Sequence, residues 1–228
     1  MSRTLSRLLV HAADALVSRD VPATLPADPS DMVELWMDDA KRCRKYLDPW
    51  AMVVATSTPC GCPSARVVLC KAVERRPLAL TFYTRYSSRK GMEIEANPRA
   101  AAVFHWPHAK RQLRMEGPIQ QMTSEENDAY FASRPLLSRL AAVASDQSKV
   151  LGSRAELLAH VVMAAQAAAK GGPQRPPMWG GYRLVATRVE LWVGGLGRLH
   201  DRVEWRSSAA ETTAGGSGVS WAARRLCP

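Results

Sequence analysis

Short apolar segments separated by turn residues dominate the pattern of this chain. Two of them, 51–57 and 64–73, flank the turn TPCGCP and predict a β-hairpin. In 111–122 polar and apolar residues alternate, so that Leu113 and Met115 share one face, as in a strand with one buried side. The same criteria predict further strands over 78–84, 100–106, 181–194, 202–206 and 219–226.

Helix signals separate these strands. Residues 28–47 have a helical apolar pattern, with Asp28 as the expected cap and Pro29 at the first helical position. A short helix is expected over 87–97, because Pro98 disfavours helical backbone at the residue before it. Two capping boxes, in which Glu follows Ser or Thr by three residues, predict two more helices. They consist of Thr123 with Glu126 and of Ser153 with Glu156.

The order of these elements predicts the fold class. Strands come first, helices are inserted in the middle, and strands close the chain, without the regular β-α-β alternation of a parallel sheet. There is no GxGxxG motif, so a dinucleotide-binding Rossmann fold is not expected. We therefore expect a mainly β protein of the α+β class, a mostly antiparallel barrel with attached helices.

Residues 1–27 are expected to lie outside the main domain, which we place at 28–228. The first twenty residues fit a loosely held amphipathic helix, and their Arg- and Ser-rich start weakly resembles a transit peptide. Residues 17–27 have the composition of a linker. The Gly/Ser/Thr/Ala-rich segment 207–218 is expected to be a mobile loop.

Composition narrows the classes of partner. The chain has 228 residues, with 31 Lys and Arg against 21 Asp and Glu, a formal net charge of +10. Such a charge can attract nucleic acid, an anionic membrane or a phosphorylated small molecule, or it can simply solvate the surface. No apolar run approaches the roughly 20 residues that span a bilayer, so membrane spanning is not expected.

The five cysteines indicate a reducing compartment, and we expect the cytoplasm. Their number is odd and their spacing gives no disulfide framework. Cys60 and Cys62 flank a glycine, which would suit a metal or redox pair. No second Cys/His pair lies at a zinc-like spacing, so a turn that contains two cysteines is the better interpretation and no metal is expected.

The basic residues fall where an anion could be bound. Arg66 and Lys71 lie five positions apart in one predicted strand, so ideal geometry puts them on opposite faces, one toward a ligand and one near an edge or bulge. Arg89 and Lys90 lie near the start of a predicted helix, where cations are unfavourable unless an anion is held there. A solvated SSRK turn is the alternative.

A second polar group follows. Tyr130, Arg134 and Ser138 share a face on helical spacing, which would offer two hydroxyl groups and a guanidinium to a phosphate. Pro135 argues against this grouping because it can break the helix between them. Further polar groups at predicted loop or strand positions are Gln147, Ser148 and Gln112. Together these positions predict two anionic groups bound by one globular protein.

The segment GRLHDR, near the C-terminal end of the chain, concentrates charge. If it is extended, alternation puts Arg198, His200 and Arg202 on one side, with Leu199 and Asp201 on the other. The residues alone leave open whether this side faces water or an anionic ligand. Asp201 is expected to pair with a neighbouring arginine or backbone group.

These motifs together resemble the pyridoxine/pyridoxamine 5′-phosphate oxidase family. The matching stretches occur in the family's order over roughly residues 28–228 and are SARVVLCK, FYTRYSSRKGMEIEANPRAA, RQLRMEG, DAYFASRP, SDQSK, PPMWGGYRL, VELWVGGLGRLHDR and RRLCP. The combination of SRKG…NPRA with WGGYRL and RLHDR is the specific part. The resemblance implies an FMN-binding split β-barrel and a homodimer in which both subunits contribute to each site.

The same resemblance implies the site residues. FMN would be bound by Arg66, Val67, Val68, Leu69, Cys70, Lys71, Tyr83, Thr84, Arg89, Lys90, Gln112, Gln147, Ser148, Trp192 and Arg202. The substrate would be bound by Lys71, Tyr130, Arg134, Ser138, Arg198, Leu199 and His200, and Arg198 and His200 are the candidate catalytic residues. The chain departs from the family's pattern at Trp50, at Cys70, in the unmatched residues 1–27 and in the apparent insertion at 207–218.

The activity implied is FMN-dependent oxidation of pyridoxamine 5′-phosphate and pyridoxine 5′-phosphate to pyridoxal 5′-phosphate, in vitamin B6 synthesis and salvage, with O2 reduced to H2O2. A related FMN oxidase of another substrate, such as a phenazine precursor, is the alternative. It need not keep a phosphate cradle, so the presence of Tyr130, Arg134 and Ser138 argues against it. Charge alone would also permit a non-enzymatic flavin- or nucleic-acid-binding module, but neither nucleic acid nor a membrane is expected as a partner.

Overall fold

In the described part of the chain, ten strands form one antiparallel sheet. The computed structural model describes residues 20–169, 171–208 and 220–228. Seven strands follow the order β10-β9-β8-β6-β5-β1-β2, and β3, β4 and β7 form a branch that joins the sheet where β7 pairs with β6. The strands are β1 (Ala51–Ser57), β2 (Pro63–Leu69), β3 (Ala72–Arg75), β4 (Leu78–Arg85), β5 (Arg99–Trp106), β6 (Arg111–Gln121), β7 (Trp179–Val185), β8 (Arg188–Val193), β9 (Asp201–Ser207) and β10 (Trp221–Leu226).

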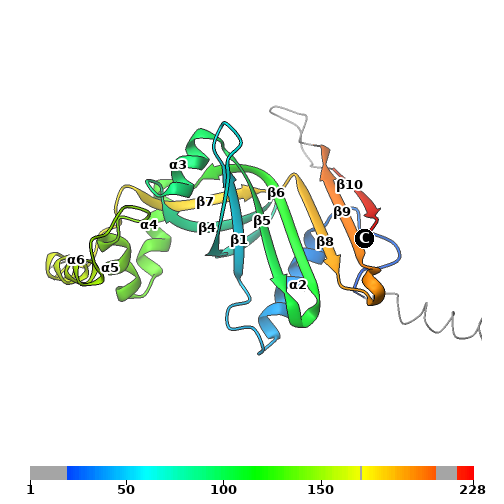
Figure 1. Ribbon diagram of the computed structural model, residues 1–228, viewed down its shortest axis with the longest axis horizontal. Helices are drawn as coiled ribbons and strands as arrows, with labels where there is room; N and C mark the ends of the chain where they lie inside the picture. The colour runs from blue at the N-terminus through cyan, green and yellow to red at the C-terminus, as the bar shows by residue number, and fades with distance from the viewer. Residues whose placement is uncertain (1–19, 170, 209–219) are drawn as a thin grey trace, which may run out of the picture.

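The described residues also contain five α-helices, and three of them gather at one end of the molecule. Figure 1 shows α4, α5 and α6 at this end and β8, β9 and β10 at the other. The predicted α+β class, a mostly antiparallel barrel with attached helices, is confirmed. None of the helices in the described residues is long and apolar enough to cross a membrane. The helices are α2 (Ser30–Arg42), α3 (Arg89–Ala96), α4 (Ser124–Ser133), α5 (Leu136–Ala144) and α6 (Arg154–Ala167).

The sheet curls because β6 changes its partner along its length. It pairs with β8 up to Glu116 and with β7 from Ile119. One extra residue on the β7–β8 side, a β-bulge, bends the neighbouring chain there. Gly117 lies opposite the bulge, and a Cβ at this position would come within 1.9 Å of the carbonyl oxygen of Val185. The single strand predicted over 181–194 is therefore two strands joined at a bend.

The strand predicted over 64–73 is also divided, because the chain changes partner at Cys70. The amide of Cys70 still donates to the Trp50 carbonyl beside β1, at 2.9 Å. The next amide, that of Lys71, donates instead to the Thr81 carbonyl of β4, at 2.7 Å. The hairpin predicted from 51–57 and 64–73 forms, but it ends at Leu69.

Helix starts agree with the sequence in part. In α4 both bonds of the capping box form between Thr123 and Glu126. In α6 the hydroxyl of Ser153 accepts from the Glu156 amide, but the Glu156 carboxylate accepts from Gly152 rather than from Ser153. The helix α2 begins one residue later than predicted, at Ser30, whose amide donates to Asp28 at 2.7 Å.

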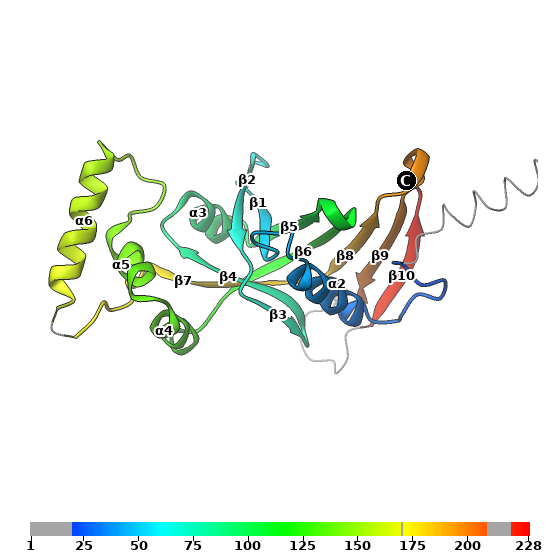
Figure 2. The same cartoon turned by 90° about the horizontal axis from the view of Figure 1, so that it is seen from below.

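Residues 20–27, predicted as part of a linker, lie against the sheet. The carboxylate of Asp20 pairs with Arg111 of β6 at 2.6 Å, and the indole of Trp205 donates to the Pro26 carbonyl at 2.8 Å. Next to them α2 buries Trp36, whose ring lies 4.9 Å from the Arg111 guanidinium; Figure 2 shows this helix beside β6 and β8. The amphipathic helix expected before residue 20 and most of the 207–218 loop fall outside the described residues.

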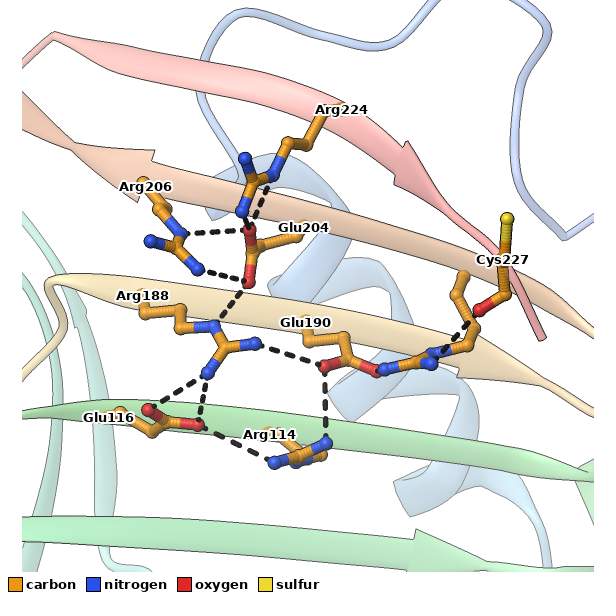
Figure 3. Close-up of polar contacts among 9 residues, drawn as sticks. Arg114, Glu116, Arg188, Glu190, Glu204, Arg206, Arg224 and Cys227 are labelled. Atoms are coloured by element: carbon orange, nitrogen blue, oxygen red, sulfur yellow. Dashed lines mark hydrogen bonds and ion pairs between the residues drawn. The ribbon is translucent and has the colours of Figure 1, made fainter.

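Opposite the core side, β6, β8, β9 and β10 present a ladder of arginine and glutamate side chains (Figure 3). The side chains of Glu190 and Glu204 are only 2% and 0% exposed, and they lie directly opposite each other on neighbouring strands. Such a pair is unfavourable by itself. Five arginines surround the two carboxylates and offset the repulsion between them. These arginines are Arg114, Arg188, Arg202, Arg206 and Arg224.

The environment of Glu204 favours its ionised form. Burial alone would raise the pKa of its carboxyl group. The hydrogen bonds from Arg206, Arg188 and Arg224 outweigh this and lower the pKa to about 2. The stabilisation from this group is therefore complete above the unfolded pKa near 4.5 and is lost as the pH falls toward 2.

We predict that Glu204→Gln lowers the free energy of unfolding by about 2–3 kcal/mol at pH 7, because it removes the buried negative charge that pairs with Arg188, Arg206 and Arg224. The loss stays at the low end of the range for buried pairs because Arg206 and Arg224 are about half exposed and can be rehydrated. Urea unfolding followed by circular dichroism measures the change. Glu116→Gln, at a more exposed carboxylate of the ladder, is the control, and equal losses in both variants would contradict the prediction.

Candidate functional site

A cleft of about 1080 Å³ opens between β2, β4, α3, α4 and α5. It is lined by side chains from distant parts of the sequence. The predicted site residues that the structure brings together there are Arg66, Val67, Val68, Leu69, Lys71, Tyr83, Thr84, Arg89, Lys90, Tyr130, Arg134, Ser138, Gln147 and Ser148.

One group of cations in the cleft is arranged around the start of α3, and we call it the α3 cluster: Arg66, Arg89 and Lys90. The Lys90 side chain is buried, and its ammonium donates to Gln147 at 2.8 Å and to Thr84 at 3.0 Å. Burial and the nearby Arg66 charge lower the pKa of Lys90 to about 8. A buried ammonium beside two arginines is an arrangement that an anion would stabilise.

The second group, which we call the α4–α5 cluster, consists of Tyr130, Arg134 and Ser138. All three line the cleft, but the helical face predicted for them is wrong: α4 ends at Ser133, and α5 begins after Pro135. Their proximity comes from the turn between two helices. The argument from Pro135 against a continuous helix was correct.

Arg134 has an unusual environment for a cation. Its guanidinium lies 4.7 Å from the ring of Trp179, and its Nη1 atom is buried with no hydrogen-bond partner among the described residues. Burial lowers the pKa of Arg134. Beside it the rings of Tyr83 and Tyr130 stack at 3.7 Å. A guanidinium with a buried, unpaired nitrogen beside an aromatic wall has the chemistry to pair with a carboxylate or phosphate.

Cys70 does not join the other predicted cofactor residues. Its side chain is 2% exposed, does not line the cleft, and donates to the Ala72 carbonyl at 3.2 Å. Burial raises the pKa of the thiol to about 12, so it stays protonated. It packs in the core at the point where the chain leaves β1 for β4.

The remaining predicted residues form a separate group on the strands at the far end of the sheet. Gln112, Trp192 and Arg202 lie side by side on β6, β8 and β9. The His200 ring is 4.6 Å from that of Trp192, and Arg202 pairs with Glu190 at 2.8 Å. Within one chain, this group does not line the cleft.

The extended geometry expected for GRLHDR is wrong at its start. Residues 196–198 form a 3-10 turn, with positive φ at Gly197 and Arg198, and the strand begins only at Asp201. The simple alternation therefore does not apply to Arg198, Leu199 and His200. Asp201 lies 3.8 Å from Arg225, which agrees with the structural role expected for it.

Several residues in the cleft or directly behind it were not predicted. Trp179 forms part of the aromatic wall, and Arg85 donates to the carbonyls of Ala142 and Ser145 at the end of α5. Glu93 lies behind the α3 cluster and contacts two of its cations. The i, i+4 spacing of Arg89 and Glu93 was the one local signal for this contact; the others depend on tertiary structure.

The comparisons with known proteins agree with the fold. The sequence profile of pyridoxamine 5′-phosphate oxidase matches residues 40–167, and that of the pyridoxine 5′-phosphate oxidase C-terminal dimerisation region matches 179–228. A pyridoxine/pyridoxamine 5′-phosphate oxidase of Pseudomonas paraeruginosa is 42% identical over 207 residues, which cover 90% of this chain and 91% of that protein.

Two solved structures share the architecture. PhzG from Burkholderia lata 383, in complex with tetrahydrophenazine-1-carboxylic acid, has a TM-score of 0.78 at 26% identity, over 92% of this chain and 100% of that one. A pyridoxamine 5′-phosphate oxidase-related, FMN-binding protein from Nostoc punctiforme has a TM-score of 0.67 at 16% identity, over 89% and 98%. The curled antiparallel sheet and its polar cleft thus define a split-barrel oxidoreductase. The chain belongs to the pyridoxamine 5′-phosphate oxidase family, and the prediction that it is an enzyme of this kind is confirmed.

Proposed function

We propose that the protein is an FMN-dependent oxidase that converts pyridoxamine 5′-phosphate and pyridoxine 5′-phosphate to pyridoxal 5′-phosphate, with O2 reduced to H2O2. The observation that carries the proposal is the unpaired, buried Nη1 of Arg134 in a cleft that also contains the α3 cluster. One cleft thus offers two groups of cationic and hydroxyl side chains. This matches a phosphorylated cofactor beside a phosphorylated substrate.

The donors of the cleft fit FMN. Its dianionic phosphate suits the cations Arg66, Arg89 and Lys90. The polar edge of a flavin suits the side-chain amide of Gln147 and the backbone amides of β2. Apolar side chains of Val67 and Leu69 flank the same wall. The chemistry supplied by bound FMN is two-electron oxidation of the substrate, with O2 as the final acceptor.

The α4–α5 cluster fits the phosphate of the substrate. Arg134 offers an unsatisfied guanidinium nitrogen, while Tyr130, Ser138 and Lys71 add two hydroxyl groups and an ammonium. Holding the phosphate fixes where the rest of a small substrate can lie. Such positioning is a large part of the rate enhancement in reactions between two bound molecules.

Arg198 and His200 are proposed to orient the substrate ring. In each site these two residues would come from the second copy of the chain. They belong to the C-terminal group that does not line the cleft of its own chain, and they fall within the region that matches a dimerisation profile. A homodimer would bring this group to the partner's cleft. Residues 28–228 would form the oxidase domain of each subunit.

The imidazole of His200 is oriented by the backbone. Its Nδ1 atom accepts a hydrogen bond from the Gly195 amide at 3.1 Å, so the neutral ring holds its proton on Nε2. Trp192 packs against one side of the ring. His200 would therefore present an N–H donor to a ring substituent of the substrate, while Arg198 supplies positive charge beside it.

The cytoplasm is the proposed location. All five cysteines of the chain are free thiols, as expected in a reducing compartment.

The second candidate is an oxidase of a phenazine precursor, favoured by the similarity to PhzG. The higher identity to proteins named pyridoxine/pyridoxamine 5′-phosphate oxidase supports the first proposal, as does the α4–α5 cluster.

The deciding experiment begins with the absorption spectrum of the purified protein, in which we expect a flavin band. H2O2 formation is then measured with pyridoxine 5′-phosphate, pyridoxamine 5′-phosphate and a dihydrophenazine carboxylic acid. Turnover of the first two supports the proposal, while turnover of the third alone supports the second candidate. A colourless protein that also fails to bind added FMN would contradict both.

The affinity of the apoprotein for FMN is expected to fall as the pH rises above about 8. The phosphate stays dianionic in this range, whereas Lys90 begins to lose its proton. Binding of the anion raises the pKa of Lys90, so binding takes up a proton and weakens by up to about tenfold per pH unit. Quenching of flavin fluorescence measures the dissociation constant between pH 7 and 9.5.

In Lys90→Met the affinity should be lower at pH 7 and nearly independent of pH. Lys41→Met, at an exposed position on α2, should behave as the wild type. If the dissociation constant of the wild type does not change between pH 7 and 9.5, the charge of Lys90 does not contribute to FMN binding.

Shared sites predict complementation between two impaired variants. Arg134→Gln should raise the KM for pyridoxine 5′-phosphate by roughly 10- to 100-fold, because a charge-assisted phosphate contact is lost. Arg198→Ala should lower kcat without changing the melting temperature. If each site combines Arg134 of one subunit with Arg198 of the other, a mixed dimer regains one intact site.

Coexpression of the two variants should then restore roughly a quarter of the wild-type activity, since about half of the dimers are mixed and one of their two sites is intact. Arg154→Gln, at an exposed position on α6, is the control for the first variant. Activity that stays at the average of the two single variants would show that both arginines serve a site within one subunit.

A further inference from the structure

Glu93 lies directly behind the α3 cluster, outside the cleft itself. Its side chain is only 6% exposed, and it projects from α3 toward β1 and β2. One carboxylate oxygen, Oε2, accepts from the hydroxyl groups of Thr56 and Ser64, each at 2.5 Å, and from Arg66 at 3.3 Å. The other, Oε1, accepts from Nε of Arg89 at 2.9 Å. A single buried carboxylate therefore joins two cations of the cleft.

We propose that Glu93 is a positioning residue that sets Arg66 and Arg89 for the phosphate of the cofactor. The inference rests on the proposed function, because it takes FMN as the molecule bound there. Glu93 would not touch the ligand, since it does not line the cleft. It would act through the two guanidinium groups.

The contacts of Arg66 show how firmly its side chain is fixed. Its Nη1 atom donates to the Val54 carbonyl at 3.2 Å and to Thr56 at 2.6 Å, while Nη2 donates to Ser64 and Glu93. The guanidinium is thus held against β1 before any ligand arrives. Such preorganisation improves affinity because less side-chain freedom is lost on binding.

Arg89 depends on Glu93 more strongly. Its side chain is 63% exposed, and its bond to Glu93 uses only Nε, so the two terminal nitrogens lie outside that bond. A long exposed side chain would otherwise sample several rotamers. The i, i+4 ion pair limits this motion and leaves the outer edge of the guanidinium for an anion.

Because Glu93 is negatively charged, the direction in which its removal changes phosphate affinity tests the proposal. Burial would raise the pKa of this carboxyl group, but the hydrogen bonds that it accepts outweigh burial and lower the pKa to about 2. It is therefore negative at neutral pH, close to where a dianion would bind. By charge alone its removal should strengthen phosphate binding; by loss of positioning it should weaken it.

The experiment compares FMN with riboflavin, which lacks the phosphate, on the apoproteins of the wild type and Glu93→Gln. Fluorescence quenching gives both dissociation constants. We expect the constant for FMN to rise roughly tenfold, as for one charge-assisted hydrogen bond, and that for riboflavin to stay unchanged. Glu95→Gln, at an exposed position on the same helix, should leave both unchanged.

The pH profile gives an independent readout. The negative charge of Glu93 raises the pKa of Lys90, so its removal should shift the loss of FMN affinity to lower pH than in the wild type. A purely structural role would weaken FMN and riboflavin binding together, whatever the midpoint. That result, or tighter FMN binding, would overturn the proposal.

Circular dichroism establishes whether Glu93→Gln is folded. If it is not, Thr56→Val removes a hydrogen bond to both Glu93 and Arg66 and should weaken FMN binding several-fold, again without affecting riboflavin; unchanged FMN binding would overturn the proposal. A wild-type protein that binds neither flavin would instead refute the proposed function, so the two failures can be told apart.

Discussion

The fold depends on the point where β6 exchanges β8 for β7 as its neighbour. A strand can hold two different partners on one edge only if the backbone there leaves room, and Gly117 provides it by letting the Val185 carbonyl approach. The bulge on the opposite side turns β7 toward β4, and β4 leads directly into α3. The cleft therefore exists because the sheet bends at this place.

Local signals in the sequence were enough to predict most elements and the fold class. Alternation and capping residues act over a few positions, so the hairpin of β1 and β2 and the capping box of α4 were predictable. The breaks at Cys70 and near Val185 were not, because both arise when the chain exchanges one neighbouring strand for another. The positive φ of Arg198 is likewise set by the turn around it and not by its own preference.

The residues of the candidate site were predicted one by one, but their arrangement in space was not. Basic and hydroxyl side chains could be identified from the sequence, and most of them meet in the cleft. Two features required the structure: the separation of the Arg198–Arg202 segment from the cleft of its own chain, and the carboxylate of Glu93 behind the cations. A buried acid that orients other residues gives little signal of its own, since in a sequence it looks like any helix-surface glutamate.

The ladder on β6, β8, β9 and β10 has a consequence for association. A sheet face rich in charge is normally a poor contact surface, because each ion must lose its water when another molecule covers it. Here Glu190 and Glu204 have already lost theirs, and their arginines keep hydrogen-bond partners inside the same chain. A second protein surface laid over this face would meet two carboxylates that are already dehydrated and paired with arginines. Part of the dehydration cost of covering this face has therefore already been met when the chain folds.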